Sequence, residues 1–212
     1  MLIIHPEKKN PDLEELLKKE AVKRIYPKET ILCSPGDMLN SISYIAQGRI
    51  KCYAINQQGT EKTIHVYNSG WFMREGIFLM DTPFIANRFL ETEATSVLYN
   101  IDSSCYERLK KYDVFQSAIL LSCSSKVEFL RQEIESMMFD SGKDRLLKFL
   151  KSMSNTDDIK DSKWATVKMS YTQQQLAGII GVNRVTISRF ISELCRSGDI
   201  RVVNRKYQVR ID

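Results

Sequence analysis

The chain has 212 residues, of which 43% are hydrophobic and 27% charged, and its 31 basic and 26 acidic side chains give a formal net charge of +5. This composition excludes a disordered or collagen-like chain, and without a run of about 18 apolar residues it excludes a membrane span. Because the first residues show no secretory signal pattern, we expect a cytoplasmic protein.

The N-terminal part predicts a helix followed by a β-roll. Apolar residues at helical spacing run from Leu13 to Ile25 and include Val22, and Pro27 is expected to end this helix. From 30 to 101 the pattern changes to short alternating segments, separated by turns roughly every 8–15 residues. Strands and turns at this spacing predict an antiparallel β-roll of the jelly-roll type.

Two helices are predicted after the roll. The first runs to Tyr112 with Asp102 or Ser103 as its N-cap, and the second runs from about Val114 to Phe139. The second helix carries apolar residues at alternating spacings of three and four, which is the seam of a coiled coil. Such a seam favours a homodimer, although the same stripe would also serve to pack on the chain's own body. The candidate dimerisation residues on this seam are Leu120, Cys123, Val127, Leu130, Ile134 and Met137.

Residues 139–142 (Phe-Asp-Ser-Gly) break the helical pattern and form the predicted hinge. We therefore expect three parts: a roll domain at 1–112, a dimerisation helix and hinge at 113–140, and a C-terminal domain at 141–212. The elements predicted for the last part are a helix at 144–153, a linker at 154–163, a strand at 165–169, two further helices, and a terminal hairpin of strands 200–203 and 207–211.

Residues 173–190 satisfy seven positional requirements of a helix-turn-helix. Ala177 lies where the two helices approach closely and a large side chain would clash. Gly181 lies in the turn, at a position that needs a positive φ. An ordinary helical hairpin rarely combines both small residues with the full apolar set, so the match is specific. The five apolar positions that must be buried between the crossed helices hold Leu176, Ile180, Val182, Ile187 and Phe190.

The second helix of this motif is predicted to enter the major groove of DNA, with Asn183 as its N-cap. Arg189 can bind guanine or a phosphate, whereas Val185 offers only an apolar contact that suits a thymine methyl group. Residues 141–212 hold 14 basic and 7 acidic side chains, a net charge of +7 against −2 for the first 140 residues, which also favours an anionic partner. The candidate DNA-binding residues are Thr172, Gln173, Gln175, Asn183, Arg184, Val185, Thr186, Ser188, Arg189 and Lys206. Those expected to contact phosphates, with a role as solvated surface residues as the alternative, are Thr172, Gln173, Gln175 and Lys206.

The sequence contains no signature of a metal site or of catalysis. The five cysteines are scattered, without a Cys-x-x-Cys pair, and only two histidines are present. Zinc, iron–sulfur and His/carboxylate oxygenase sites therefore lack their ligands, and we expect no enzyme activity, no metal and no cofactor. A thiol-based redox regulator and a ligand-binding module without a DNA role are the alternatives. The thiol alternative would use Cys33, Cys105 or Cys195. The other cysteines and histidines of the chain are Cys52, Cys123, His5 and His65.

From about residue 10 the whole chain resembles the CRP/FNR superfamily of bacterial transcription regulators. The resemblance implies a homodimer through the long helix, a roll that senses a small-molecule effector, and a winged helix-turn-helix that binds a palindromic operator in double-stranded DNA. Activation of transcription would add RNA polymerase as a partner. The motifs that carry the resemblance are Pro35-Gly36-Asp37, Tyr44 to Lys51, Gly70 to Glu75, and Gly181 to Arg189.

The sequence departs from the cyclic-nucleotide-binding members of this family. Glu75 matches the glutamate that holds the ribose, but Arg74 replaces the glycine before it. The segment 84–89 also lacks the Arg-Ser/Thr pair that holds the phosphate. The resemblance therefore argues against cyclic AMP as the effector, and the absence of an N-terminal cysteine cluster argues against an iron–sulfur switch.

Residues 185–189 (Val-Thr-Ile-Ser-Arg) are similar to the branch that regulates reductive dehalogenation and binds halogenated aromatics. That similarity implies an A/T-rich palindromic operator near TTAAT-N4-ATTAA, and an aromatic acid as effector, bound between the roll and the long helix. For each aromatic residue of this candidate pocket, the alternative is a place in the hydrophobic core. For Arg74, the alternative is a salt bridge to a carboxylate of the roll. The candidate effector-binding residues are Trp71, Phe72, Arg74, Glu75, Arg88, Phe89 and Leu130.

Overall fold

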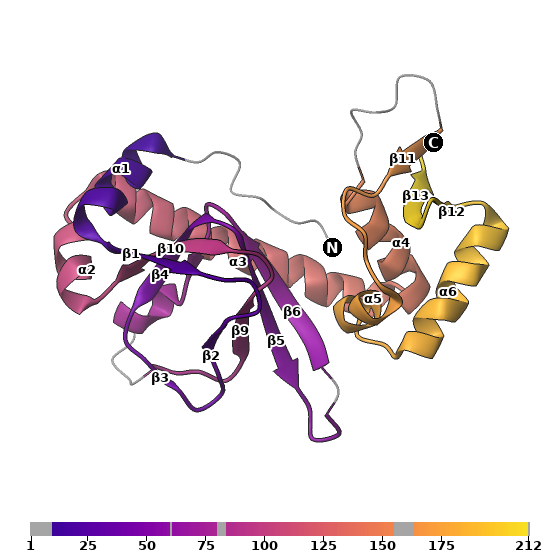
Figure 1. Cartoon of the computed structure of the whole chain (residues 1–212), viewed down its shortest axis with the longest axis horizontal. Helices are drawn as coiled ribbons and strands as arrows, with labels where there is room; N and C mark the ends of the chain where they lie inside the picture. The colour runs from indigo at the N-terminus through magenta and orange to yellow at the C-terminus, as the bar shows by residue number, and fades with distance from the viewer. Residues whose placement is uncertain (1–9, 60, 80–83, 155–162, 212) are drawn as a thin grey trace. The chain divides into compact units, whose positions relative to one another are not determined.

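The computed structural model describes residues 10–59, 61–79, 84–154 and 163–211. Its internal contacts divide the chain into two units, one that ends at Val127 and one that begins at Glu128 (Figure 1). The long helix α3 (Asp113–Phe139) therefore contributes to both units. Within the described ranges, no helix combines the length and the apolar character needed to cross a membrane.

The N-terminal helix is shorter than the sequence pattern predicts. Asn10 caps α1 (Pro11–Glu20), because its side-chain oxygen accepts hydrogen bonds from backbone N–H groups of the first turn. The chain then forms the edge strand β1 (Val22–Tyr26), so the prediction of a helix through Ile25 is wrong. Val22 and Ile25 are 55% and 63% exposed on this strand. Their β-branched side chains favour an extended backbone, and their spacing only coincides with a helical period.

The residues from Ile31 to Ile101 form the predicted antiparallel β-roll. Its elements are β2 (Ile31–Cys33), β3 (Met38–Leu39), β4 (Ile42–Gln47), β5 (Arg49–Ile55), β6 (Glu61–Asn68), β7 (Phe72–Met73), the short 3-10 helix η1 (Glu75–Phe78), β8 (Phe84–Ile85), β9 (Phe89–Thr92) and β10 (Ser96–Ile101). In the described chain they make two four-stranded sheets, with the orders β1-β10-β4-β7 and β2-β9-β5-β6, and the pair β3-β8.

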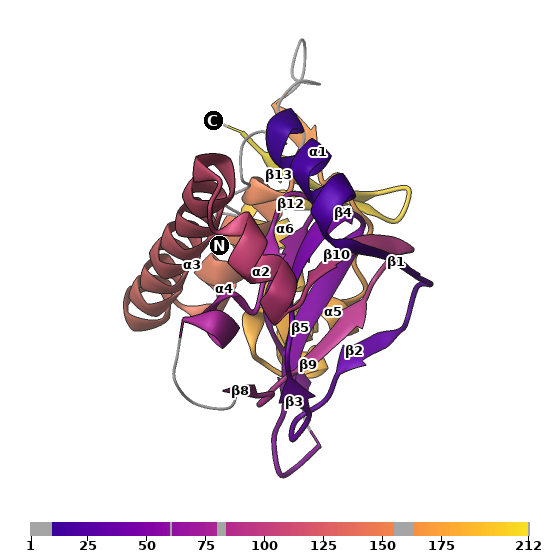
Figure 2. The same ribbon diagram turned by 90° about the vertical axis from the view of Figure 1, so that its left-hand side faces the viewer.

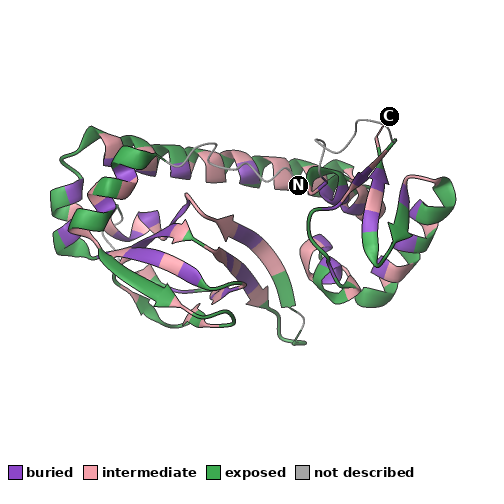
Figure 3. Cartoon of the chain, turned by 45° about the horizontal axis from the view of Figure 1, so that its top comes forward, coloured by how far each residue is buried: buried purple, intermediate pink, exposed green. Residues whose placement is uncertain are grey.

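Two apolar clusters fill the interior of this unit (Figure 3). One lies within the roll and includes Ile45, Ile50 and Trp71. The other joins the roll to the helices and includes Phe72 of β7 and Phe115 of α3, whose rings meet edge to face at 5.8 Å. The first turns of α3 are therefore part of the core of the unit that ends at Val127.

Both helices predicted after the roll are present. Asp102 caps α2 (Ser103–Leu109), as predicted, by accepting a hydrogen bond of 2.8 Å from the N–H of Cys105. α2 packs on the end of α1 (Figure 2). There the Nε atom of Arg108 lies 2.9 Å from the carboxylate of Glu20. α3 begins one residue before its predicted start and ends at the predicted residue.

The unit that begins at Glu128 contains the end of α3 and a small domain with one apolar core. Its elements after α3 are α4 (Gly142–Ser152), β11 (Trp164–Thr166), α5 (Gln173–Ile180), α6 (Arg184–Ser197), β12 (Ile200–Val203) and β13 (Lys206–Arg210). The strands form a sheet in the order β11-β13-β12, which confirms the predicted terminal hairpin. The core includes Leu146, Phe149, Leu176, Ile187 and Leu194.

Two boundaries in this unit differ from the predictions. α4 begins at Gly142 rather than at Asp144, because Ser141 and Asp144 form a capping box that starts the helix earlier. β11 ends at Thr166, short of the predicted 169, although Val167 still pairs with Ser154 in an isolated bridge. Of the predicted linker, residues 155–162 lie outside the described residues.

Candidate nucleic-acid interface and sensor site

The helix-turn-helix has the local geometry that the sequence requires. Thr172 caps α5, since its Oγ1 accepts from the N–H of Gln175 (3.1 Å) while the Gln175 Oε1 accepts from the N–H of Thr172 (2.9 Å). Gly181 ends α5 with φ +78°, the left-handed conformation expected at the turn. Ala177 is 2% exposed at the crossing of the helices. Among the predicted apolar positions, Leu176, Ile180 and Ile187 are buried, and Val182 and Phe190 are partly buried against the same core.

The N-terminal half of α6 presents an exposed face. Asn183 caps this helix, and its Oδ1 atom accepts a hydrogen bond of 2.8 Å from the N–H of Thr186. Arg184, Val185 and Arg189 are exposed, Val185 to 79%, whereas Thr186 and Ser188 are half-buried. The Asn183 cap and the buried residues Ile187, Ile191 and Leu194 hold α6 in the domain. Its exposed side chains are therefore carried by a well-positioned helix. This is the arrangement by which a recognition helix reads base edges.

Arg189 has an acidic neighbour that was not among the predicted site residues. Glu193 lies one turn further along α6, with its carboxylate 3.9 Å from Arg189 and 3.4 Å from Lys143 of α4. The Arg189 guanidinium also lies 5.6 Å from the centroid of the Phe190 ring. These side chains are 40–68% exposed, so the contacts are weak and a phosphate can replace them. A spacing of four residues between Arg189 and Glu193 is the signal that indicates this pair.

The hairpin of β12 and β13 forms a basic wing. Asn204 and Arg205 make its turn with positive φ values of 49° and 63°, which match the right-handed twist of the strands. Arg205 and Lys206 are exposed at the tip. Arg201, which the sequence analysis did not single out, lies 4.4 Å from the centroid of the Trp164 ring and donates a hydrogen bond of 2.7 Å to Gln208. The wing thus holds one of its arginines against its own sheet and leaves the tip residues available.

A buried ion pair joins the roll to α3 in the unit that ends at Val127, which we call the sensing unit because its roll is the candidate sensor. The Glu75 carboxylate, whose side chain is 6% exposed, pairs with the Nζ atom of Lys126 and accepts a hydrogen bond of 2.5 Å from Ser122 Oγ. The Lys126 ammonium also donates to the carbonyl oxygen of Phe72 at 2.7 Å. Burial lowers the pKa of Lys126, and the neighbouring Glu75 carboxylate acts against that shift. Glu75 is therefore engaged with α3 of its own chain.

Aromatic rings surround the Lys126 ammonium. The ring centroids of Tyr67 and Trp71 lie 5.2 Å and 5.8 Å from its Nζ atom, within cation–π range. His65 packs against both rings at 4.4 Å and 5.4 Å. Burial, and then the charge of Lys126, lower the pKa of His65 to about 4, so its imidazole is neutral at pH 7. His65 therefore has a structural role as a neutral member of this ring cluster.

Arg74 forms a hydrogen bond to a hydroxyl group instead of an ion pair. It has a left-handed backbone (φ 68°) at the start of η1, and its guanidinium donates to Ser43 Oγ. Burial lowers the pKa of Arg74. Within the described residues it pairs with no carboxylate, so the salt bridge that is its alternative role does not form with any carboxylate of the described part of the roll.

The other candidate effector residues lie in different environments. The side chain of Phe72 lies in the core with Tyr44 and Phe115, and Phe89 stacks on Tyr53 at 5.0 Å. Arg88 is exposed, and Leu130 belongs to the other unit. The structure therefore brings Trp71, Glu75 and the backbone carbonyl of Phe72 together with Lys126, whereas the side chains of Phe72 and Phe89 pack on other rings.

A cleft of about 390 Å³ lies between α1, β7 and the first half of α3. Trp71 and Phe72 contribute to its lining, with Leu13 of α1 and Leu121 of α3. Neither Arg74 nor Glu75 lines it. Among the described residues, no group of three or more His, Cys, Asp or Glu side chains is arranged to hold a metal ion.

The predicted seam of α3 is exposed in the single chain. Its apolar residues are between 50% and 67% exposed, although Cys123 is half-buried. Exposed apolar side chains at this regular spacing need a partner surface, because an isolated soluble helix rarely leaves a whole stripe in water. The exposed members are Leu120, Val127, Leu130, Ile134 and Met137.

Two family models match the chain in the order of its two folded parts. The cyclic nucleotide-binding domain matches residues 23–113, and the Crp-like helix-turn-helix domain matches residues 144–212. The chain belongs to the CRP/FNR family of transcription regulators. Like other CRP/FNR regulators, it combines a DNA-binding domain with an effector-binding type of domain.

Relatives and solved structures agree with this CRP/FNR assignment. The chain is 31% identical over 132 residues to the HTH-type transcriptional regulator ycf28 of Porphyra purpurea, covering 59% of this chain and 54% of the relative, so it spans about half the length of that protein. It is 23% identical over 181 residues to the anaerobic regulatory protein of Haemophilus influenzae, covering 85% of this chain and 69% of that protein. The structure of the c-di-GMP responsive global regulator CLP of Xanthomonas campestris has the same fold, with a TM-score of 0.79 at 18% identity over 96% of this chain and 100% of that chain.

Proposed function

We propose that this CRP/FNR regulator binds a palindromic, A/T-rich operator as a homodimer, under the control of a small anionic effector that acts on the sensing unit. The observation that carries the proposal is the exposed face of α6, with Val185 between Arg184 and Arg189. Two such helices, related by the symmetry of a dimer, suit two half-sites in successive major grooves.

Homodimerisation is supported by the exposed seam on α3. Pairing two copies of the seam would bury its apolar side chains against their equivalents in the second chain, at about 25 cal/mol for each Å² removed from water. The seam extends over nearly three heptads, from Leu120 to Met137. A dimer through α3 would also relate the two recognition helices by a twofold axis, as a palindrome requires.

The preference for A·T pairs is supported by the chemistry of Val185. This side chain is 79% exposed and carries no hydrogen-bonding group, so it has no acceptor for the amino group of cytosine. It can contact the methyl group of thymine. Arg184 and Arg189 on either side supply contacts to phosphate or guanine.

The anionic effector is supported by two partly buried cations, Lys126 of α3 and Arg74 at the start of η1. Lys126 is shared between Glu75 and the Phe72 carbonyl, and Arg74 has only a hydroxyl acceptor within the described residues. An acid with an aromatic body would match these cations and the rings of Tyr67 and Trp71. The alternative, a thiol-based regulator, has less support. Burial raises the pKa of the cysteine thiols at 33, 52, 105, 123 and 195, which disfavours the reactive thiolate.

Selection of DNA duplexes from a random pool tests the proposed operator. The purified, reduced protein should enrich an A/T-rich palindrome, either alone or after addition of chlorinated aromatic acids. Arg189→Ala should lose most of the enrichment, whereas Lys18→Ala, an exposed lysine of α1, should retain it. If no sequence is enriched under any of these conditions, the proposal is wrong.

Sedimentation velocity tests the homodimer. The wild-type chain should sediment at twice its monomer mass, and Val127→Asp combined with Ile134→Asp should convert it to monomer by placing charges in the seam. Val22→Asp is the matched control, because Val22 is also an exposed apolar residue but lies on β1. A wild-type monomer at the concentrations that bind DNA would contradict the dimer.

A further inference from the structure

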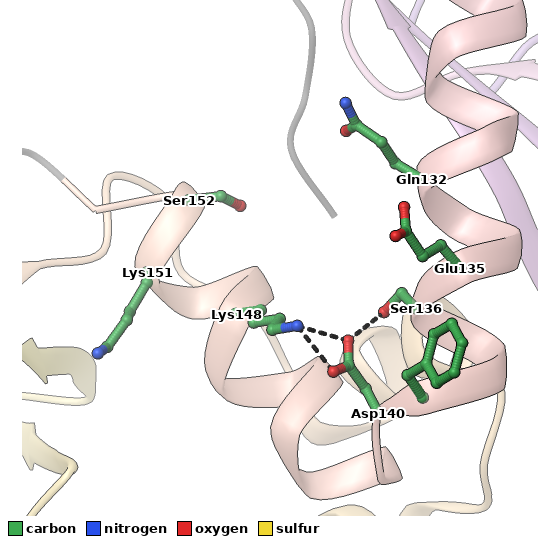
Figure 4. A pocket seen from close by; sticks show the side chains of 8 residues that line it. Gln132, Glu135, Ser136, Asp140, Lys148, Lys151 and Ser152 are labelled. Carbon is green, nitrogen blue, oxygen red and sulfur yellow. Dashed lines mark hydrogen bonds and ion pairs between the residues drawn. The ribbon is translucent and has the colours of Figure 1, made fainter.

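The junction between α3 and α4 is held by several side-chain bonds. The Asp140 carboxylate accepts hydrogen bonds of 2.7 Å from Lys148 Nζ and of 2.7 Å from Ser136 Oγ, so it connects the last turn of α3 with α4 (Figure 4). These bonds, that from Lys148 first, lower the pKa of Asp140. The carboxylate is therefore ionised at neutral pH and remains bound to both helices. This region was predicted as a hinge, and in this structure its two sides are connected.

Arg145 binds the ends of two helices. Its guanidinium donates to the carbonyl oxygen of Asp140, just after α3, at 3.2 Å, and to that of Ile180, the last residue of α5, at 3.3 Å. Carbonyl groups at helix C-termini lack donors within their own helix and carry the negative end of the helix dipole. A guanidinium suits them, because its N–H groups point in several directions and it keeps its charge.

The first turn of α4 also packs directly on the recognition helix. A Cβ atom added to Gly142 would lie 2.9 Å from the Cε2 atom of Phe190, closer than real Cβ contacts. Lys143, the next residue, lies 3.4 Å from the Glu193 carboxylate of α6. The end of α3 is thus connected to α5 through Arg145, and to α6 through Gly142 and Lys143.

We propose that Arg145 is a positioning residue for operator recognition. It holds the helix-turn-helix at a fixed angle to the end of α3, and so sets the distance between the two recognition helices of the dimer. The inference rests on the proposed homodimer through α3. Arg145 itself reads no base, because its guanidinium is engaged with backbone carbonyl groups. Its loss should leave the fit to one half-site intact and relax the requirement for one spacing between half-sites.

The test uses the full chain and the duplex enriched by selection. Affinities are measured for that operator, for operators with one or two base pairs inserted between the half-sites, and for a single half-site. Arg145→Met should reduce the preference for the native spacing by about tenfold, the loss expected for hydrogen bonds from a charged group. Its affinity for the single half-site should change less than about twofold. Lys151→Met, which removes an exposed charge from the same helix, should keep the wild-type preference.

A conservative variant separates positioning from charge. Arg145→Lys keeps the positive charge, but a single ammonium on a different stem cannot reproduce the two-armed contact, so the spacing preference should be only partly restored. Without DNA, Arg145→Met should also speed amide hydrogen exchange at the end of α5 and leave the β12–β13 hairpin unchanged.

Two results would overturn the inference. One is Arg145→Met with the wild-type spacing preference. The other is an equal loss of affinity for the half-site and for every operator, which would make Arg145 a residue of the domain fold alone. If that variant does not fold, Asp140→Asn combined with Lys148→Met removes a connection from the exposed side and carries the same prediction. A wild-type protein that enriches no duplex contradicts the proposed function instead, and the amide-exchange result then decides on Arg145.

Discussion

The charged residues at the two candidate sites, one in each unit, differ in how far they are buried and paired. In the sensing unit, the side chains of Glu75 and Lys126 are 6% and 19% exposed and are bound to each other. On the recognition helix, Arg189 is 68% exposed and lies 3.9 Å from the Glu193 carboxylate, at the limit of an ion pair. The DNA-binding surface can therefore accept a partner without losing strong internal contacts. A ligand of the sensing unit must compete with an ion pair that is already formed.

The largest expected effect comes from breaking the buried pair. Glu75→Gln leaves the Lys126 ammonium buried without its counter-ion and should lower the free energy of unfolding by about 3 kcal/mol. Glu61→Gln is the matched control, since it removes a partner of Lys51 from a more exposed pair and should cost less than about 1 kcal/mol. Urea denaturation measures both. Equal decreases in the free energy of unfolding for the two variants would show that the buried Glu75–Lys126 pair stabilises the fold no more than the more exposed Lys51–Glu61 pair does.

The dependence of stability on pH tests the burial of His65, which lies beside the Glu75–Lys126 pair. Its pKa is lowered from 6.5 to about 4 in the folded protein, so the unfolded chain binds more protons between these values. Stability contributed by the neutral imidazole should be fully present above pH 6.5 and fall as the pH decreases towards 4, by up to about 3 kcal/mol. His65→Phe should remove this part of the slope in urea denaturation. An unchanged slope in the variant would assign it to other groups.

On the exposed surface, Val185→Glu should change specificity more than stability. The new carboxylate can accept from the amino group of cytosine, so the preferred pair at the position that residue 185 contacts should shift from A·T to G·C, by about 2 kcal/mol. Competition binding with substituted operators measures the shift. Val202→Glu adds the same charge to an exposed position of the wing and should weaken binding without changing the preferred base. An unchanged preference in the Val185 variant would remove this residue from base contact.

The smallest effect is expected at the tip of the wing. Lys206→Ala removes an exposed charge that is predicted to contact a phosphate. Its affinity should fall about threefold for all operators alike, and the dependence of affinity on salt should decrease by about one ion. Titrations at several salt concentrations measure both quantities. A loss confined to one sequence would instead indicate a base contact.

The helix-turn-helix could be predicted almost completely from the sequence, and the sensor site only in part. The requirements at Ala177 and Gly181 are local, since a crossing and a turn restrict side-chain size and φ within a few residues. Glu75 was found through a motif, but its partners Ser122 and Lys126 are 47 and 51 positions away and meet it only when α3 packs on the roll. The role of Arg145 could not be predicted, because its acceptors are backbone carbonyl groups, which every residue type carries.

The chain has two tryptophans, and the division into units assigns one to each. Trp71 is 2% exposed among His65, Tyr67 and Lys126, whereas Trp164 lies under Arg201 at the base of the wing. Their intrinsic fluorescence therefore reports on separate events. In a Trp164→Phe protein the emission should follow changes around the ion pair, and in a Trp71→Phe protein it should follow contact of the wing with DNA. Comparing the two time courses after rapid mixing would give the order in which ligand and operator act on the regulator.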